Sequence, residues 1–382
     1  MIQKFKIEKT NLKVYIKNYF IKNLKIKSFP RNYDIEFNDN ISKIKKNIIQ
    51  TNSISIIDKN IYNKYFKNIK NKRIIKINAK EKYKNLKTIN KILKFFVRNK
   101  VTKKNQIFAV GGGIIQDLAG YSCLVYKRGL YWEYIPTTYL GMTDSCVGGK
   151  VGINFGNAKN LAGLFSAPRK VIINLNFLKT LNKKELLSGL GESVRLHMTG
   201  GKYFIKSINQ NIEDAIKNKK YPLKRIIINS LLVKRAVVEE DEYEFNIRRS
   251  MNFGHSCGHA LEILSKYKLS HGTAVMIGMC LESIVSHHNF GIKKDVVNSV
   301  ITLASKILTN NDLKIVKSIQ LKNLNTIMYK DKKTLAGLIK LTVPKKEGEI
   351  KFFNQKLNKK NIEDFKKAKY LFLKILNEKN SN

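Results

Sequence analysis

The stretch QIFAVGGGIIQD, residues 106–117, decides the fold class of the first half of this chain. Five mainly apolar residues, typical of a buried strand, run directly into Gly111, Gly112 and Gly113, and the apolar spacing that follows is helical. A glycine run between a strand and a helix lets backbone N–H groups approach a phosphate, whose charge the helix N-terminus favours. The stretch lacks the G-x-G-x-x-G spacing, so a tight turn without a ligand is an equal alternative, in which Asp117 only complements the helix dipole.

Segments on either side continue this alternation of strands and helices up to about residue 182. Short apolar runs predict strands at residues 53–58, 73–78, 131–136 and 171–174. Helical spacing of apolar residues covers 84–99 and 114–126. Strands that alternate with helices predict an α/β N-terminal domain with a mainly parallel, Rossmann-like sheet.

Beyond residue 183 the pattern becomes that of a mostly α-helical C-terminal domain. Helices are predicted at residues 183–198, 223–240, 255–268, 273–288 and 293–309, with a short β-like pair near 339–343 and 349–353. We therefore expect a basic N-terminal extension (1–22), an α/β domain (23–182) and a helical domain (183–382). The Lys- and Asn-rich residues after 354 are expected to be solvated.

The net charge of +45 comes from 73 basic and 28 acidic residues. Only ten of the basic residues are Arg, and the excess lies in Lys, beside abundant Asn and Ile. These residues have A/T-rich codons, so the drift of an A/T-rich bacterial genome explains the charge without selection for a partner. With no RNP or zinc-finger spacing, no specific nucleic-acid partner is expected, although a nucleic-acid-binding protein is the alternative from another class.

The four cysteines are widely spaced and include no Cys-x-x-Cys pair. This fits neither a disulfide framework nor a thiolate zinc site, and it favours a reducing, cytoplasmic compartment. No run approaches 18 apolar residues, so no membrane span is predicted. The first 22 residues lack the apolar core of a secretory signal.

A second glycine-containing segment, TDSCVGGK at residues 143–150, ends in a lysine. Flexible glycines beside Lys150, with the amides of Asn154 and Asn160 downstream, suit an anionic ligand. An ordinary surface lysine is the alternative, and the glycine pair favours the ligand.

Three of the six histidines fall between residues 255 and 271. His255 and His259 lie four apart, on one face of a predicted helix. Ser256 stands where a His-Glu-x-x-His metalloprotease has its glutamate, which disfavours that class. A third imidazole, His271, together with a carboxylate could complete a catalytic zinc site with an open position. The alternative is a set of core histidines.

Residues 234–252 gather charged groups. Glu244, Arg248 and Asn252 are each four apart, so they share a face if this stretch is helical. The four acids at residues 239–242 are expected to meet a metal, a helix dipole or a basic cluster. A solvated charged helix is the alternative.

Nine segments, taken in order, resemble the 3-dehydroquinate synthase family. They are GGGIIQDLAG (111–120), YKRG (126–129), IPTT (135–138), TDSCVGGKVGIN (143–154), KNLAGLF (159–165), LGES (190–193), VKRAVVEEDE (233–242), MNFGHSCGHALE (251–262) and SHGTAVMIGM (270–279). The resemblance implies an NAD-binding α/β domain and a helical domain that holds a divalent metal, most often Zn²⁺, with Co²⁺ as a substitute. It also implies an NAD- and metal-dependent phosphate lyase of the shikimate pathway.

The implied reaction turns 3-deoxy-D-arabino-heptulosonate 7-phosphate into 3-dehydroquinate and phosphate. It proceeds by transient NAD oxidation, phosphate elimination, reduction, ring opening and aldol cyclisation. The nearest rival hypothesis is another sugar-phosphate cyclase. A polyol dehydrogenase of related fold and a non-catalytic relative are two further hypotheses.

Site residues follow from the resemblance, motif by motif. The implied metal ligands are Glu192, His255 and His271. The implied catalytic groups are His259, Lys150, Arg195, Asp144 and Glu244. The implied substrate-binding groups are Arg128, Asn160, Lys234, Arg248, Asn252 and Lys340, and Arg128 would reach the phosphate across a homodimer interface. The implied NAD-binding residues are Asp58, Glu81, Lys84, Gly112, Gly113, Asp117, Thr137, Thr138 and Thr180.

A few positions depart from the family pattern. Arg195 stands where the family has Lys, and a planar guanidinium does not reproduce a compact ammonium. Thr273 replaces a Glu, and Lys80 and Asn246 occupy positions that the family gives to Gly. No implied metal ligand is lost, so we predict an active but slow enzyme.

Overall fold

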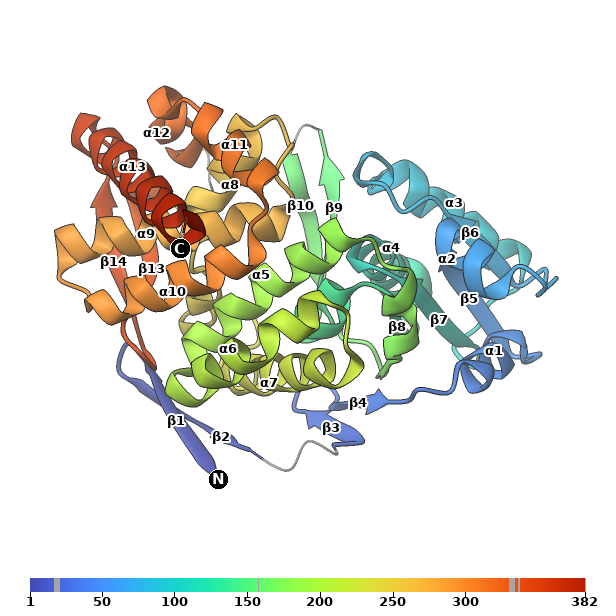
Figure 1. Ribbon diagram of the computed structural model, residues 1–382. Coiled ribbons are helices and arrows are strands. Elements are labelled where there is room, and N and C mark those ends of the chain that lie inside the picture. The colour runs from blue at the N-terminus through green and yellow to red at the C-terminus, as the bar shows by residue number, and fades with distance from the viewer. Residues whose placement is uncertain (17–20, 157, 330–333, 336, 382) are drawn as a thin grey trace. The chain divides into compact units, whose positions relative to one another are not determined.

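The computed structural model describes residues 1–16, 21–156, 158–329, 334–335 and 337–381. The chain divides into two compact units (Figure 1). One comprises residues 18–181, and the other comprises residues 1–17 together with 182–382.

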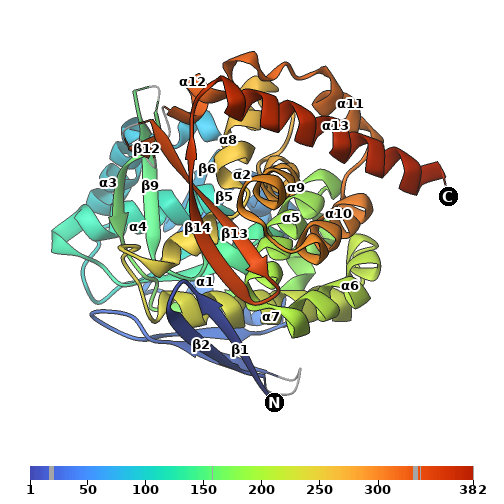
Figure 2. The same cartoon turned by 90° about the vertical axis from the view of Figure 1, so that its left-hand side faces the viewer.

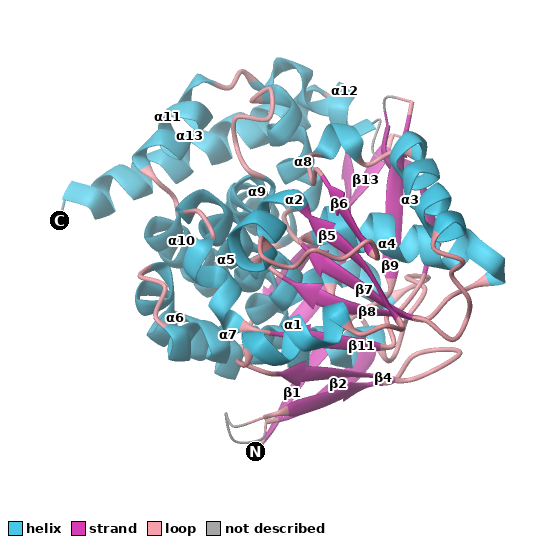
Figure 3. Ribbon diagram, turned by 90° about the vertical axis from the view of Figure 1, so that its right-hand side faces the viewer, coloured by secondary structure: helices cyan, strands magenta, loops and turns pink. Residues whose placement is uncertain are grey.

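A seven-stranded sheet with the order β3-β4-β11-β8-β7-β5-β6 forms the 18–181 unit (Figure 3). All neighbouring strands are parallel except β3 and β4. The prediction of a mainly parallel α/β sheet is therefore confirmed. The strands are β3 (Asn23–Ile26), β4 (Tyr33–Phe37), β5 (Ser53–Asp58), β6 (Ile74–Ile77), β7 (Gln106–Gly111), β8 (Trp132–Pro136) and β11 (Lys170–Ile173).

Besides the sheet and short 3-10 and π turns, the described residues of this unit form four α-helices and a hairpin. The helices are α1 (Ile41–Ile49), α2 (Lys59–Ile61), α3 (Leu86–Arg98) and α4 (Gly113–Val125), and the hairpin pairs β9 (Lys150–Phe155) with β10 (Ala158–Phe165). The sequence patterns did not predict α1, β3, β4 or the hairpin. In the sheet, Gly111 on β7 is opposite Pro136 on β8, so the glycine run and Thr137 emerge at the same edge.

Helices dominate the other unit. They are α5 (Lys183–Gly200), α6 (Lys202–Ile216), α7 (Lys220–Val238), α8 (His255–Leu264), α9 (His271–Phe290), α10 (Lys294–Ile307), α11 (Asn310–Ser318), α12 (Leu324–Tyr329) and α13 (Lys359–Ser381). Helix α9 is buried from Gly272 to Ser286 and packs against α5, α8, α10 and α13. A largely apolar helix that is buried on all sides is the core around which the others assemble.

The first residues, which we predicted only as a basic N-terminal extension, form regular structure. Strands β1 (Ile2–Ile7) and β2 (Thr10–Tyr15) form an antiparallel hairpin, and β1 pairs with β14 of the five-stranded sheet β12-β13-β14-β1-β2 (Figure 2). The remaining strands are β12 (Thr334–Leu335), β13 (Leu338–Lys346) and β14 (Glu349–Lys356). The hairpin buries Phe5, Ile7, Leu12 and Val14, an alternation that identifies half-buried strands among the lysines.

The end of the chain also differs from its prediction as solvated. Helix α13 buries Phe365, Ala368, Phe372 and Leu376, each at most 1% exposed. The spacings of three, four and four residues place these side chains on one face, while most of the lysines of the helix lie on the other faces. The composition of the segment concealed this apolar stripe.

Two further expectations concern cysteines and membranes. All four cysteines are buried, and none of them forms a disulfide in this structure. Within the described part of the chain, no helix has both the length and the apolar character needed to cross a bilayer.

Candidate functional site

Three helices of the second unit bring a carboxylate and three imidazoles together. Glu192 lies in α5 and is 1% exposed. His255 is the first residue of α8, His259 follows one turn later, and His271 is the first residue of α9. The four-residue spacing of His255 and His259 places both on one face of α8, as predicted.

The distances within this group, which we call the histidine cluster (Glu192, His255, His259 and His271), suit a shared cation. One ring nitrogen from each histidine lies within 4.8 Å of the other two. Glu192 Oε1 is 3.7 Å from His255 Nε2 and 3.3 Å from His271 Nε2. This oxygen is buried and accepts no well-aligned hydrogen bond from the described residues, and its nearest partners are the two imidazole nitrogens, so a metal between them would be coordinated by all three groups.

Neighbouring groups fix the direction of each ligand. Arg195 Nε donates to Glu192 Oε2 at 2.8 Å, and Arg195 Nη1 donates to the carbonyl of Met251 at 2.7 Å. Glu192 Oε1 is thereby turned towards the imidazoles. Burial opposes ionisation of Glu192, but Arg195, His255 and His271 together outweigh it and hold the pKa of this carboxyl well below its usual range.

Glu262 is a partner that the sequence patterns did not identify. Its Oε2 lies 3.0 Å from His271 Nδ1. Burial opposes protonation of His271, but the carboxylates of Glu192 and Glu262 outweigh it and raise the pKa of the imidazole to about 10. With Nδ1 held, Nε2 faces Glu192, which is the carboxylate–histidine arrangement common at metal sites. The spacing of His255, His259 and Glu262, four and then three residues apart, already placed them on one face.

The donor set fits a catalytic divalent metal. Burial pushes the pKa of His255 well below its usual value, so this imidazole is neutral and able to coordinate. His271, whose pKa is raised by the two carboxylates, would release its Nε2 proton when a metal binds. Three protein ligands of nitrogen and carboxylate type leave a fourth position for substrate, which is typical of catalytic zinc sites. His259 lies one turn beyond His255, within reach of that position.

In the other unit, the glycine run forms an open turn at the N-terminus of α4. Gly112 occupies the N-cap position, so no side chain caps the helix. A Cβ on Gly112 would lie 2.8 Å from Thr138 Cγ2, whereas a Cβ on Gly113 would meet nothing nearer than Ser145 Oγ at 4.0 Å. The uncapped N–H groups and the open space at Gly113 fit a phosphate of a dinucleotide.

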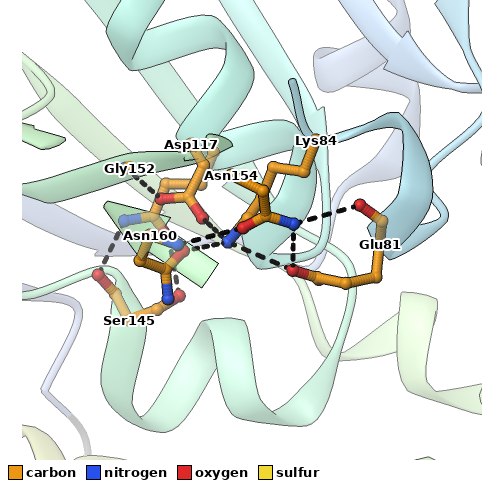
Figure 4. Close-up of polar contacts among 8 residues, drawn as sticks. Glu81, Lys84, Asp117, Ser145, Gly152, Asn154 and Asn160 are labelled. Atoms are coloured by element: carbon orange, nitrogen blue, oxygen red, sulfur yellow. Dashed lines mark hydrogen bonds and ion pairs between the residues drawn. The ribbon is translucent and has the colours of Figure 1, made fainter. Parts of the chain in front are cut away.

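The buried side chain of Lys84 is the centre of a polar network in the same unit (Figure 4). Its Nζ donates to Asp117 Oδ2 at 2.9 Å and also to Asn160 Oδ1, and it lies 3.8 Å from Glu81 Oε1. Asp117 Oδ1 accepts from the backbone N–H of Gly152 at 3.1 Å. Burial raises the pKa of Asp117, although the ammonium of Lys84 opposes the rise. The network joins Lys84 and Asp117, expected at NAD, with Asn160, expected at the substrate phosphate.

The remaining implied residues of this unit lie at strand and helix ends. Thr137 is buried, and its N–H donates to the carbonyl of Gly111 at 3.0 Å. Asp58 ends β5 and accepts from the N–H of Asn60, while Thr180 Oγ1 lies 2.9 Å from the Tyr65 hydroxyl. Asp144 lies in a helical turn, and Lys150 is exposed at the start of β9.

The charged segment after α7 is not the helix that would align its residues. Glu244 has a φ of 64°, and only a 3-10 turn, Ile247–Asn252, follows. The premise of a shared helical face was therefore wrong. Asn252 Nδ2 nevertheless contacts Glu244 Oε1 at 3.5 Å, and the Arg248 guanidinium donates to the carbonyl of Glu242. Lys234 is buried in α7, and Lys340 is exposed on β13.

Asp241, from the acidic run, organises this segment. Its carboxylate accepts the backbone N–H groups of Phe245, Asn246 and Arg248 at 2.8–3.0 Å. Of the partners that we expected for the run, Glu239 meets a basic group, Arg235, at 2.9 Å.

Comparison with known proteins gives matches over most of the chain. A family model described as 3-dehydroquinate synthase N-terminal matches residues 74–188, and one described as 3-dehydroquinate synthase C-terminal matches residues 189–334. The chain is 35% identical to the 3-dehydroquinate synthase of Pelagibacter ubique, over 90% of this chain and 97% of that one. It is 33% identical to that of Buchnera aphidicola subsp. Cinara cedri, over 89% and 90%.

Solved structures with the same fold are more distant in sequence. A 2-epi-5-epi-valiolone synthase from Streptomyces hygroscopicus, with NAD⁺ and Zn²⁺ bound, is 19% identical with a TM-score of 0.76, over 92% of this chain and 99% of that one. A 2-deoxy-scyllo-inosose synthase complexed with carbaglucose-6-phosphate, NAD⁺ and Co²⁺ is 22% identical with a TM-score of 0.73, over 91% and 99%. Together with the matched family models, the 35% identity over nearly the whole length shows that this chain belongs to the 3-dehydroquinate synthase family.

Proposed function

We propose that this chain converts 3-deoxy-D-arabino-heptulosonate 7-phosphate into 3-dehydroquinate and phosphate. The observation that carries the proposal is the histidine cluster, in which the buried Glu192 Oε1 faces two imidazole Nε2 atoms without a hydrogen-bond partner among the described residues. Curated relatives that are 33–38% identical bear the name of this activity, whereas the other sugar-phosphate cyclases are 19–22% identical.

Glu192, His255 and His271 would hold the divalent metal, with Zn²⁺ preferred for its affinity for nitrogen and carboxylate ligands and Co²⁺ as a substitute. When bound, the metal would polarise a substrate hydroxyl, and NAD would accept and then return a hydride. Arg195 keeps the Glu192 carboxylate ionised and aimed at the imidazoles, and Glu262 keeps His271 Nε2 turned towards them.

NAD would lie along the edge of the sheet where β5, β7 and β8 end. Gly112 and Gly113 offer uncapped backbone N–H groups to its phosphates. Asp58, Glu81, Lys84, Asp117, Thr137, Thr138 and Thr180 are the other residues that we assign to it. The Lys84–Asp117 pair holds a charged group in a fixed position at this edge.

Cationic and amide groups would bind the two anionic ends of the substrate. We assign Lys150, Asn160, Asn252 and Lys340 to the phosphate, and Lys234 and Arg248 to the carboxylate. His259 would face the leaving phosphate and stabilise its charge, Asp144 would contact substrate hydroxyls, and Glu244 would orient Asn252. Most of the work is positioning and electrostatic stabilisation.

A homodimer in the cytoplasm completes the proposal. Arg128 is exposed, follows Lys127 in the left-handed region (φ 59° and 49°), and its guanidinium makes no hydrogen bond or ion pair with any described residue. An exposed guanidinium without a partner among those residues could donate hydrogen bonds to a phosphate that is bound by a second copy of the chain. Titrating an inactive His259→Ala chain into an Arg128→Ala chain would test this, because mixed dimers should regain activity.

The main test measures phosphate release from the heptulosonate phosphate with NAD and Zn²⁺, with and without a chelator, while 3-dehydroquinate is followed in the same sample. Chelator-sensitive release with equal formation of 3-dehydroquinate would support the proposal. Release of phosphate with a different carbocyclic product would favour another sugar-phosphate cyclase. No release by the folded, zinc-loaded protein would refute both.

A further inference from the structure

Helices α8 and α9, which carry the three imidazoles of the histidine cluster, approach each other through glycines. A Cβ on Gly278 of α9 would overlap the Gly254 carbonyl oxygen and would lie 2.8 Å from Gly258 N. A Cβ on Gly258 would lie 2.9 Å from Val275 Cα. The backbone at the start of α8 therefore rests directly on α9, with no side chain between them.

Glu282 of α9, one turn beyond Gly278, contacts this same point. It is fully buried, and its Oε2 accepts the N–H of Gly254 at 2.9 Å while its Oε1 accepts the N–H of Cys257 at 2.8 Å. These two N–H groups lie on either side of His255. Both carboxylate oxygens thus bind the backbone that bears a proposed metal ligand.

This carboxylate replaces a local cap. Gly254, at the N-cap of α8, has a φ of 78° and no side chain that could accept from the first turn. In most helices a Ser, Thr, Asp or Asn at that position binds an N–H of the first turn. Here the acceptor comes from the neighbouring helix, and its negative charge also complements the α8 dipole. A local cap would stabilise α8 alone, whereas Glu282 in addition fixes α8 relative to α9.

We infer that Glu282 is a positioning residue of the metal site. It fixes the rotation of α8 about its own axis, so that His255 and His259 face His271 before any metal binds. The inference rests on the proposed metal-dependent function. Together with Glu262, which extends from α8 to His271 on α9, it makes the two helices hold each other's ligands. Neither contact touches the substrate or the metal.

The test replaces Glu282 with Gln and measures metal affinity and the visible absorption of bound Co²⁺, with Zn²⁺ affinity taken from competition with a chelator. A Gln of the same shape has one carbonyl oxygen, so one of the two N–H groups faces an N–H₂ donor. Loss of an outer-shell contact weakens metal binding about 10- to 100-fold, and we expect about tenfold with an altered Co²⁺ spectrum. The matched control is Ser283→Ala, the buried neighbour on α9 whose hydroxyl makes no hydrogen bond with the described residues.

Each result has a defined meaning. If the Glu282→Gln protein folds and binds Zn²⁺ and Co²⁺ as the wild type does, Glu282 is only a stabilising cap and the inference is wrong. If the wild type binds neither metal, the proposed function has failed instead, and the two failures are therefore distinguishable.

If Glu282→Gln does not fold, amide hydrogen exchange of the wild type tests whether Glu282 positions α8 before metal binds. Protection of the Gly254 and Cys257 amides in the metal-free protein would support preorganisation by Glu282. Protection gained only when metal is added would overturn it.

Discussion

The two buried polar centres of this protein satisfy their charges in opposite ways. In the Lys84 network, the ammonium has Asp117, Asn160 and Glu81 around it, and Asp117 has a backbone N–H as well. In the histidine cluster, Glu192 Oε1 has no hydrogen-bond donor among the described residues, although imidazole nitrogens stand 3.3 and 3.7 Å away. The Lys84 network satisfies its charges without an ion. The histidine cluster, oriented by Arg195 and Glu262, leaves an oxygen and imidazole nitrogens that could coordinate the metal we propose.

Replacing His271 with Ala should have the largest effect, because it removes a proposed ligand of the incomplete centre. We expect metal binding to weaken by more than the roughly 10–100-fold that loss of an outer-shell partner costs, with phosphate release falling to background. Metal content after dialysis and turnover would be measured together. His288→Ala, on α9 but away from the cluster, is the matched control. Retention of stoichiometric Zn²⁺ by His271→Ala would contradict the assignment.

Replacing Lys84 with Met should destabilise the fold, because it removes the charged partner of Asp117 from the Lys84 network. It leaves the half-buried Asp117 carboxylate with one N–H donor, and because breaking a fully buried pair costs roughly 3 kcal/mol or more, we expect a loss of unfolding free energy of up to about 3 kcal/mol. Denaturant unfolding would measure the loss, with exposed Lys87→Met on α3 as the control.

The pH dependence of this variant provides a further check on its cause. The pKa of Asp117 is raised in the folded protein. Its protonated form therefore contributes stability that is present below the pKa of the unfolded chain and is lost as the pH rises through the higher pKa of the folded protein. The deficit of Lys84→Met should therefore shrink in acid. A deficit that stays constant with pH would argue against an unpaired carboxylate as its cause.

Replacing Glu262 with Gln should have a moderate effect, since it changes the neighbour of a ligand and leaves the ligand in place. His271 loses a charged acceptor at Nδ1, and we expect Zn²⁺ affinity to fall about tenfold. Chelator competition would measure the affinity, with Glu378→Gln, exposed on α13, as the control. Unchanged affinity would mean that the Nδ1 contact does not orient the ring.

The strand–glycine–helix order of residues 106–117 predicted the sheet because buried strands have continuous apolar runs. The pattern failed where lysines and asparagines dilute it. The hairpin β1–β2 buries alternate residues, and α13 buries one face only, so the composition of the first segment indicated a basic extension and that of the second indicated solvated chain. The hairpin is stabilised by pairing with β14 at the other end of the chain, and α13 by packing against α9, so no local window contains these partners.

In the site too, local sequence spacing predicted some residues, whereas others depend on contacts between distant segments. The spacing of His255 and His259 is local, and the sequence alone identified them as ligand candidates. Glu192 lies 63 residues before His255, and only the family resemblance supplied it. Glu282 contacts the backbone of α8 from a different helix, and nothing in the residues around it indicates that contact.

The smallest expected effect concerns Asp241, which holds the segment bearing Arg248 through three backbone N–H groups. Burial would raise the pKa of this carboxyl, but those hydrogen bonds outweigh it and lower the pKa. The stabilisation is therefore present above the pKa of the unfolded chain and is lost as the pH falls through the lower pKa of the folded protein.

Asp241→Asn should reproduce this loss at neutral pH, because its amide has one acceptor oxygen. We expect KM to rise about fivefold, equivalent to roughly 1 kcal/mol, with kcat nearly unchanged. Asp295→Asn, exposed on α10, is the control, and an unchanged KM would show that Arg248 needs no such support.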